Sequence, residues 1–323
     1  MGRIQYTGLV GDVGGTNARF AVVDQQGHVR NPRIFPASEY DSLADVIAEY
    51  VETTCGRSRP TRAVIAVAGP VVDGEIEFTN LDWQISEGDL LAHFEFEAVK
   101  LINDFAAQAL AAPRLHPEEL KAIGPKIRGG SDCPLVVLGA GTGFGVAGLA
   151  RGDRGDVAVA TEGGHVGFAP TDEVEDQILA HFRKVFGRVS VERILSGAGI
   201  FELYKALAAI EGQRLTAADQ KGVVEAANQK DPLAEAALER FCAIMGSVAG
   251  DIALTFGARG GVYVSGGIGP KIADRLAASS FRARFEDKGR LTGYMQQIPT
   301  SLVLHPYPAI IGAARELEQM ERL

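Results

Sequence analysis

Short apolar runs alternate with amphipathic stretches along this chain, in two blocks that share one plan. In each block an apolar run of strand length meets glycines and a threonine, and a second apolar run follows at once. The pattern therefore predicts the same unit twice, a strand, a tight turn and a strand. The first hairpin covers residues 9–24, and the second covers residues 136–146.

The same pattern predicts the other elements of both blocks. Strands are expected at 63–67, 98–102, 135–138, 143–150, 157–161 and 261–264, and a hairpin-like piece at 71–79 around Asp73-Gly74. Helices are expected at 42–51, 86–94, 175–186, 191–195, 200–208, 233–256, 271–277 and 309–323, and one more opens after Asn103-Asp104. The last helix is expected to pack back on the first block. This order predicts two α/β domains, residues 1–114 plus 306–323 and residues 115–305, with a cleft between them.

Composition agrees with an enzyme of this shape. At 323 residues the chain exceeds the size at which single cores usually stop growing, and 46% apolar with 23% charged residues are ordinary globular values. The net charge of −9 comes without a basic block, so we expect no nucleic-acid partner. No run reaches membrane-spanning length and the N-terminus does not resemble a signal peptide, so we expect no membrane partner and a cytoplasmic protein. Cys55, Cys133 and Cys242 lack the spacing of a disulfide framework or a zinc site.

The glycines of the two hairpins suit phosphate binding. Glycine lets backbone N–H groups approach an anion closely, and a threonine hydroxyl adds a donor. Two commoner phosphate motifs are excluded. No Gly-Lys-Ser or Gly-Lys-Thr occurs, and the G-x-G-x-x-G at Gly143, Gly145 and Gly148 leads into a strand and a turn, not a helix. Two such loops suggest a nucleotide held from both sides.

Six segments, taken in order, resemble the bacterial ATP-dependent glucokinases. They are residues 11–19, 102–105, 139–143, 162–165, 192–197 and 265–268. The resemblance covers nearly the whole chain and implies the duplicated ribonuclease H-like fold of the actin-like ATPases. It implies that ATP is held by Gly11, Asp12, Val13, Gly14, Gly15, Thr16, Thr142 and Gly143, with Gly266 and Gly267 near the adenosine.

Asp104 is the candidate catalytic base. Phosphorylation of a sugar hydroxyl requires a carboxylate near that oxygen to accept its proton. Asp104 follows an apolar strand, at the carboxyl end where α/β sheets place ligands. Asn103 could bind the sugar, because an amide both donates to and accepts from hydroxyls. Alternatively, either residue caps the following helix, and the two roles can coexist.

Three further residues are candidate sugar ligands. Glu162 and His165 flank two glycines after a strand, and a carboxylate beside a neutral imidazole can read adjacent hydroxyls. The alternative for His165 is a solvated side chain or one bonded to backbone. Glu192 fits equally well as the acidic first turn of a helix, and only the family pattern indicates a sugar ligand.

Asp12 lies in the first hairpin, where phosphates would repel a carboxylate unless a cation intervened. We therefore expect Mg²⁺ to arrive with ATP and to be held near Asp12 largely through its own waters. The alternative is a local turn in which the carboxylate accepts from nearby N–H groups. Arg19 could meet a phosphate or project into solvent, so it is left out of the predicted site.

The resemblance implies transfer of the γ-phosphoryl group of MgATP to the 6-hydroxyl of glucose, the entry step of glycolysis. A homodimer is expected, with helix 233–256 as one contributor to its interface. No zinc site is expected, because His165 is not followed by the cysteine cluster of a related branch. Two alternatives stay open: a kinase for another hexose or an amino sugar, and a nucleotide-gated binding module of the actin or chaperone type.

Overall fold

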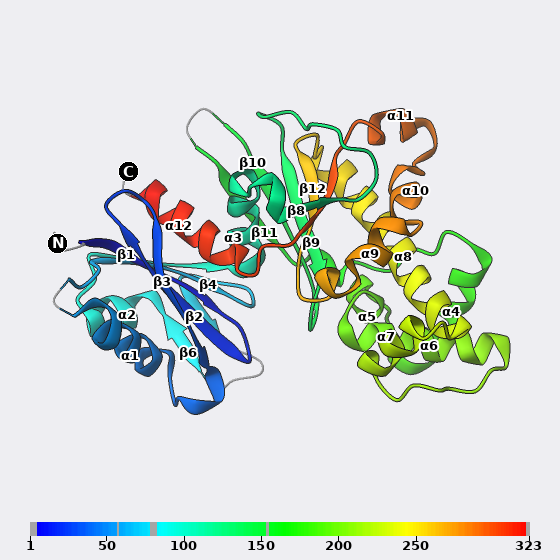
Figure 1. The fold of residues 1–323 in the computed structure, drawn as a ribbon, viewed down its shortest axis with the longest axis horizontal. Helices are drawn as coiled ribbons and strands as arrows, with labels where there is room; N and C mark the ends of the chain where they lie inside the picture. Colours follow the sequence, from blue (N-terminus) through cyan, green and yellow to red (C-terminus); the bar gives the residue numbers. More distant parts are fainter. Residues whose placement is uncertain (1–4, 57, 78–82, 153–154, 321–323) are drawn as a thin grey trace. The chain divides into compact units, whose positions relative to one another are not determined.

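The computed structural model describes residues 5–56, 58–77, 83–152 and 155–320, which divide into two compact units (Figure 1). The first unit is Met1–Leu115, Arg151–Ala160 and His305–Leu323, and the second is His116–Ala150 and Thr161–Leu304. The division expected from the sequence differs mainly by assigning residues 151–160 to the second domain, and it stays a prediction.

The first unit is built on a five-stranded sheet in the order β3-β2-β1-β4-β7. Its strands are β1 (Tyr6–Val13), β2 (Asn17–Asp24), β3 (Val29–Pro36), β4 (Arg62–Val67) and β7 (Ala98–Asn103). β1 and β2 form the predicted antiparallel hairpin, whereas β4 runs parallel to both β1 and β7. The carboxyl ends of β1, β4 and β7 therefore lie along one edge of the sheet.

Helices cover both faces of this sheet because its strand residues alternate between two cores. Leu9 packs in the same cluster as Ile47 of α1, whereas its neighbour Val10 packs with Ala313 of the C-terminal helix. The helices are α1 (Leu43–Cys55), α2 (Glu87–Phe94), α3 (Asp104–Ala111) and α12 (Pro308–Met320). A Cβ on Gly312 would lie 1.7 Å from the carbonyl oxygen of Ala107, so glycine lets α12 touch α3. The predicted return of the last helix to the first block is confirmed; its residues 321–323 lie outside the described residues.

A second sheet has six strands in the order β11-β10-β9-β12-β13-β8; five of them lie in the second unit, whereas residues 157–160 of the edge strand β11 are assigned to the first. Its strands are β8 (Leu120–Ala122), β9 (Leu135–Ala140), β10 (Phe144–Ala150), β11 (Val157–Thr161), β12 (Gly261–Val264) and β13 (Thr300–Val303). β9 and β10 form the second predicted hairpin, and β12 runs parallel to β9. The two sheets thus share one plan, an antiparallel hairpin with a parallel strand beside its first member.

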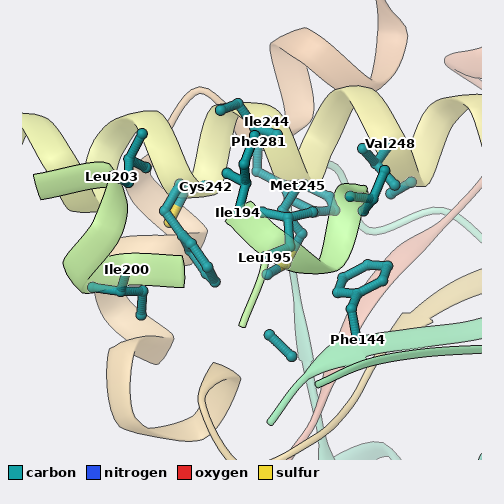
Figure 2. Close-up of a cluster of buried hydrophobic side chains, with 14 of the residues drawn as sticks. Phe144, Ile194, Leu195, Ile200, Leu203, Cys242, Ile244, Met245, Val248 and Phe281 are labelled. Carbon is teal, nitrogen blue, oxygen red and sulfur yellow. The ribbon is translucent and has the colours of Figure 1, made fainter. Parts of the chain in front are cut away.

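Eight helices of the second unit fall within the described residues, and they enclose its core. They are α4 (Glu173–Phe186), α5 (Val191–Ile194), α6 (Gly197–Glu211), α7 (Gln220–Asn228), α8 (Pro232–Phe256), α9 (Ala273–Ala278), α10 (Phe281–Glu286) and α11 (Thr292–Met295). Figure 2 shows side chains of α5, α6 and α8 in one buried cluster that also contains Phe144 of β10. Every residue from Phe241 to Gly250 of α8 is buried in its own chain. The middle of this helix therefore offers no surface to a partner, which limits the interface expected there.

Several elements differ from the expectation. β3 was not predicted, because it contains Pro32 and Pro36 and mostly exposed residues, as suits the edge position that it occupies. β8, β13, α7 and α10 were also missed, being short or polar. Asp73-Gly74 does form a hairpin turn, with both residues at positive φ and Val72 bridged to Glu75 across it. β5 (Glu75–Glu77) also pairs with β6 (Gln84–Ser86), which was not predicted. The predicted end of that piece, residues 78–79, lies outside the described residues.

Six short 3₁₀ helices complete the described part of the chain, and the helix expected at 271–277 is split by one of them. They are η1 (Ala37–Glu39), η2 (Ala112–Arg114), η3 (Pro117–Glu119), η4 (Gly163–His165), η5 (Gly269–Ile272) and η6 (Gly289–Leu291). Among the described helices, none combines the length and the apolar character needed to cross a bilayer.

Candidate active site

The turn of the first hairpin is open to solvent. Val13 pairs with Ala18, and the N–H of Gly14 donates to the carbonyl oxygen of Asn17 at 3.0 Å, so residues 14–17 form the turn. Gly15 and Thr16 are exposed. A Cβ on Gly14 would lie no closer than 3.9 Å to its surroundings. The fold therefore does not require glycine at position 14, and its contact with phosphate stays a prediction.

Gly11 has a different role from the turn glycines. It lies within β1, and a Cβ there would be 2.6 Å from Cε1 of Phe20 and 3.2 Å from Cγ2 of Ile65. This glycine makes room for the core side chains beside the hairpin, so its predicted phosphate contact gains no support from its position.

Asp12 forms an ion pair with Arg19 across the first hairpin. The two residues are register partners, and Nη1 of Arg19 lies 3.1 Å from Oδ2 of Asp12. Burial raises the pKa of Asp12, and the Arg19 guanidinium acts against that shift. The guanidinium also lies 5.4 Å from the ring centroid of Tyr307. This ion pair was not predicted, although hairpin register is the signal that places Arg19 opposite Asp12.

Asn103 and Asp104 lie where β7 ends and α3 begins. Oδ1 of Asn103 accepts from the N–H groups of Phe105 and Ala106 at 3.0 and 3.1 Å, which confirms the capping interpretation. Its Nδ2 donates to the carbonyl oxygen of Gly69 and to Oδ1 of Asp104. Oδ1 of Asp104 also accepts from the Phe105 N–H at 2.9 Å. Two donors therefore fix the orientation of the candidate base, at the same sheet edge as Asp12.

The second hairpin turn is shorter and is held by a neighbouring loop. Ala140 pairs with Phe144, so residues 141–143 form the turn. A Cβ on Gly139 would lie 1.8 Å from the carbonyl oxygen of Ser265, and Gly266 has a φ of +89°. In contrast, Gly267 has nothing within 4 Å of a Cβ position. Gly139 and Gly266 are thus required by packing, whereas Gly267 is open to a ligand.

The predicted sugar ligands of the second unit gather beside this turn. Oε2 of Glu162 lies 3.8 Å from Nε2 of His165, and both side chains are more than half exposed. Oε2 of Glu192 accepts from the backbone N–H of Phe144 at 2.9 Å. Glu192 does lie in the first turn of α5, yet its carboxylate bonds to the hairpin. The structure therefore joins one of the sugar candidates, Glu192, to the turn of the second hairpin.

A polar cavity of about 520 Å³ lies next to the loop that contains Gly267. It is lined by residues of η5, α7, α8, α9 and the loop between α7 and α8, among them Asn228, Lys230, Glu239, Lys271 and Arg275. In the described ranges, no three His, Cys, Asp or Glu side chains gather as a metal cluster. A single carboxylate such as that of Asp12 could hold a cation only with help from water or phosphate oxygens.

Two α/β units, each with an antiparallel glycine hairpin beside a parallel strand, define the actin-like ATPase class of fold. A family model described as Glucokinase matches residues 9–320. The glucokinase of Caulobacter vibrioides (strain NA1000 / CB15N) is 51% identical over 312 residues, which are 95% of this chain and 94% of that protein. The glucokinase of Chromohalobacter salexigens is 44% identical over 97% of this chain and 98% of its own.

A solved structure agrees with these relatives. The crystal structure of glucokinase from an Antarctic psychrotroph matches with a TM-score of 0.89 and 37% identity, over 97% of this chain and 99% of that one. The chain belongs to the glucokinase family.

Proposed function

We propose that this protein transfers the γ-phosphoryl group of MgATP to the 6-hydroxyl of D-glucose, giving glucose 6-phosphate and ADP. Membership of the glucokinase family supports the activity. The observation that carries the proposal is the bond from Phe144 N–H to the Glu192 carboxylate. It brings a group suited to sugar hydroxyls against a turn suited to phosphate oxygens, as a sugar kinase requires.

Each hairpin would hold ATP phosphates through its turn. In the first, Gly15 and Thr16 would present their N–H groups at an open turn, as their exposure supports, whereas the N–H of Gly14 donates to the carbonyl oxygen of Asn17. In the second, Thr142 and Gly143 would do the same. The adenosine would lie over Gly267, where a Cβ position is empty, and extend toward the polar cavity beside η5.

Mg²⁺ would come as part of the nucleotide substrate and lie near Asp12. The fit rests on this carboxylate, because burial raises its pKa and a nearby cation would favour its charged form. Mg²⁺ usually keeps several waters and takes few protein ligands, so one carboxylate suffices. Arg19 would keep Asp12 oriented while contributing positive charge near the phosphates.

Asp104 would accept the proton of the sugar hydroxyl as the bond to phosphorus forms. The two donors on its Oδ1 keep the carboxylate in one orientation, which favours in-line attack through positioning. Glu162, His165 and Glu192 would bind the other hydroxyls. Asn103 already makes four hydrogen bonds within the chain, so its amide would bind a hydroxyl by exchanging one of them. Removing the charge of Asp104 should therefore affect turnover more than sugar affinity.

The test is ADP formation from MgATP without sugar and with glucose, mannose, galactose, fructose or N-acetylglucosamine. The proposal expects ADP formation that depends on sugar and is fastest with glucose. Faster ADP formation with another sugar would show that this sugar, and not glucose, is the preferred acceptor. The same rate of ADP formation with and without every sugar would overturn the kinase proposal.

We also propose that the protein forms a homodimer, as expected from the family. Because the middle of α8 is buried in its own chain, the interface would lie on other elements. Sedimentation velocity at micromolar concentration would show a species of twice the chain mass. A single species at the chain mass would contradict the dimer.

A further inference from the structure

We propose that Glu192 couples the sugar site to the second phosphate turn, so that glucose and nucleotide strengthen each other's binding. The proposal rests on the proposed function, because it takes Glu192 as a sugar ligand. It adds that this one carboxylate serves both substrates within a single unit. The contact that does so is the hydrogen bond from the backbone N–H of Phe144, which the sequence of the hairpin does not predict.

The carboxylate of Glu192 is seated against the turn. Its Oε2 accepts from Phe144 N–H at 2.9 Å. A Cβ on Gly143 would lie 2.4 Å from the same oxygen and 3.2 Å from Cδ of Glu192. Glycine at position 143 is therefore needed for the carboxylate to reach the turn, whatever the nucleotide requires.

Phe144 also touches the other sugar-binding segment. A Cβ on Gly164, between Glu162 and His165, would lie 2.0 Å from the carbonyl oxygen of Phe144. Its N–H thus meets Glu192 while its C=O meets the turn that carries Glu162 and His165. The backbone of one residue is enclosed by both sugar-binding segments.

The core ties these segments together. The ring of Phe144 lies in the same buried cluster as Ile194 and Leu195, which come two and three residues after Glu192 (Figure 2). A short ladder adds to this: Val191 N–H donates to the carbonyl oxygen of Val166 at 2.9 Å, and Nη2 of Arg188 donates to that of His165 at 2.7 Å. Movement of either sugar-binding segment would therefore reach the hairpin turn.

Coupling follows from this arrangement. A sugar hydroxyl that donates to Glu192 fixes its carboxylate, and the fixed carboxylate in turn fixes Phe144 N–H and the adjoining Gly143. A turn already ordered by sugar loses less conformational freedom when phosphate binds, so the second ligand binds more tightly. The effect is reciprocal by thermodynamic linkage, so either ligand can be measured.

The experiment measures the Kd of glucose by calorimetry with and without saturating Mg²⁺ and AMP-PNP. For the wild type we expect glucose to bind more tightly with nucleotide, by a factor within the usual range of about 5 to 150. Glu192→Asp keeps the charge but shortens the reach, so its factor should fall to less than about a third of the wild-type factor. Glu192→Gln, whose amide oxygen can still accept from Phe144 N–H, should keep more of the factor.

Glu162→Gln is the matched control, because it removes a carboxylate on the same sugar site without touching Phe144 N–H. It should weaken glucose binding and keep the wild-type factor. Gly143→Ala is the second route to the same test, since its Cβ would displace the Glu192 carboxylate and should also lower the factor.

The coupling would be overturned if nucleotide tightened glucose binding by the wild-type factor in both Glu192→Asp and Gly143→Ala. It would also be overturned if Glu162→Gln lowered that factor as much as Glu192→Asp does. If the wild type binds both ligands and forms ADP with glucose, but its Kd for glucose is the same with and without nucleotide, the coupling is overturned and the proposed function stands. A wild type that neither binds nor phosphorylates glucose would overturn the proposed function instead.

Discussion

The two glycine hairpins differ in how their turns are supported. The first leaves residues 14–17 between its last paired residues and carries the Asp12–Arg19 ion pair across its own strands. The second leaves residues 141–143 and receives its carboxylate from Glu192, on a helix further along the chain. The carboxylate beside the turn thus belongs to the hairpin itself in the first unit, and to a neighbouring helix in the second. In the second case the neighbour is a candidate sugar ligand, and the proposed coupling of the two substrates rests on this contact.

The two units also divide the proposed chemistry. The first carries Asp104 and Asp12, the candidate base and the carboxylate near Mg²⁺. The second carries Glu162, His165 and Glu192, which suit sugar hydroxyls. If this division holds, substitutions in the two units should affect turnover and sugar affinity differently.

The largest effect is expected for Asp104→Asn. Loss of a general base commonly lowers turnover by about 10² to 10⁴-fold, and asparagine keeps an oxygen for Phe105 N–H, so the helix cap survives. Steady-state kinetics should show a much lower kcat with a KM for glucose near that of the wild type. Glu162→Gln in the second unit should show the reverse, a raised KM with kcat less changed. If kcat and the KM for glucose change in the same way in Asp104→Asn and Glu162→Gln, the proposed division of chemistry between the two units is wrong.

A second contrast concerns packing at Gly139 and Gly11. In Gly139→Ala the new Cβ meets backbone of Ser265 at 1.8 Å, whereas in Gly11→Ala it meets the movable ring of Phe20 at 2.6 Å. We expect Gly139→Ala to lose about 3 kcal/mol or more of unfolding free energy and Gly11→Ala about 1 to 2 kcal/mol. Urea denaturation measures both. Equal losses would show that the second hairpin is no more tightly held than the first.

Alanine at Gly14 and at Gly141 tests the two turns without disturbing the fold. Each new Cβ would have its nearest neighbour at 3.9 or 4.0 Å, so unfolding free energy should change by no more than about 0.5 kcal/mol. A methyl group at a phosphate contact should raise the KM for ATP about tenfold, or about 1.4 kcal/mol. If a variant is as stable as the wild type and its KM for ATP is unchanged, that turn does not contact the phosphates.

The smallest effect is expected at Asp24, at the end of β2. Burial acts to raise its pKa, but hydrogen bonds from Arg30, His28 and Gln26 together lower it to about 2. Because its unfolded pKa is about 4, these bonds stabilise the fold above that pH, and the contribution is lost as pH falls from about 4 to 2. Thermal unfolding across this range should show a steeper loss for the wild type than for Asp24→Asn. If the melting temperatures of the two proteins fall equally with pH, the lowered pKa of Asp24 is contradicted.

Sequence patterns predicted both hairpins and the cap at Asn103, because short-range glycines, alternation and capping residues determine them. They missed β3 and α7, whose polar or proline-containing sequences are held in place by neighbouring elements. The Glu192–Phe144 bond could not be predicted either, since it joins residues 48 positions apart through tertiary packing. The ion pair of Asp12 with Arg19 was within reach, because hairpin register alone sets them opposite each other.

The most direct test of the central claim is a phosphorus NMR spectrum of the protein incubated with MgATP and glucose labelled with carbon-13 at C6. The account predicts one new phosphomonoester resonance, split by coupling to the labelled carbon, together with ADP. Release of inorganic phosphate alone, or no change in ATP, would contradict it.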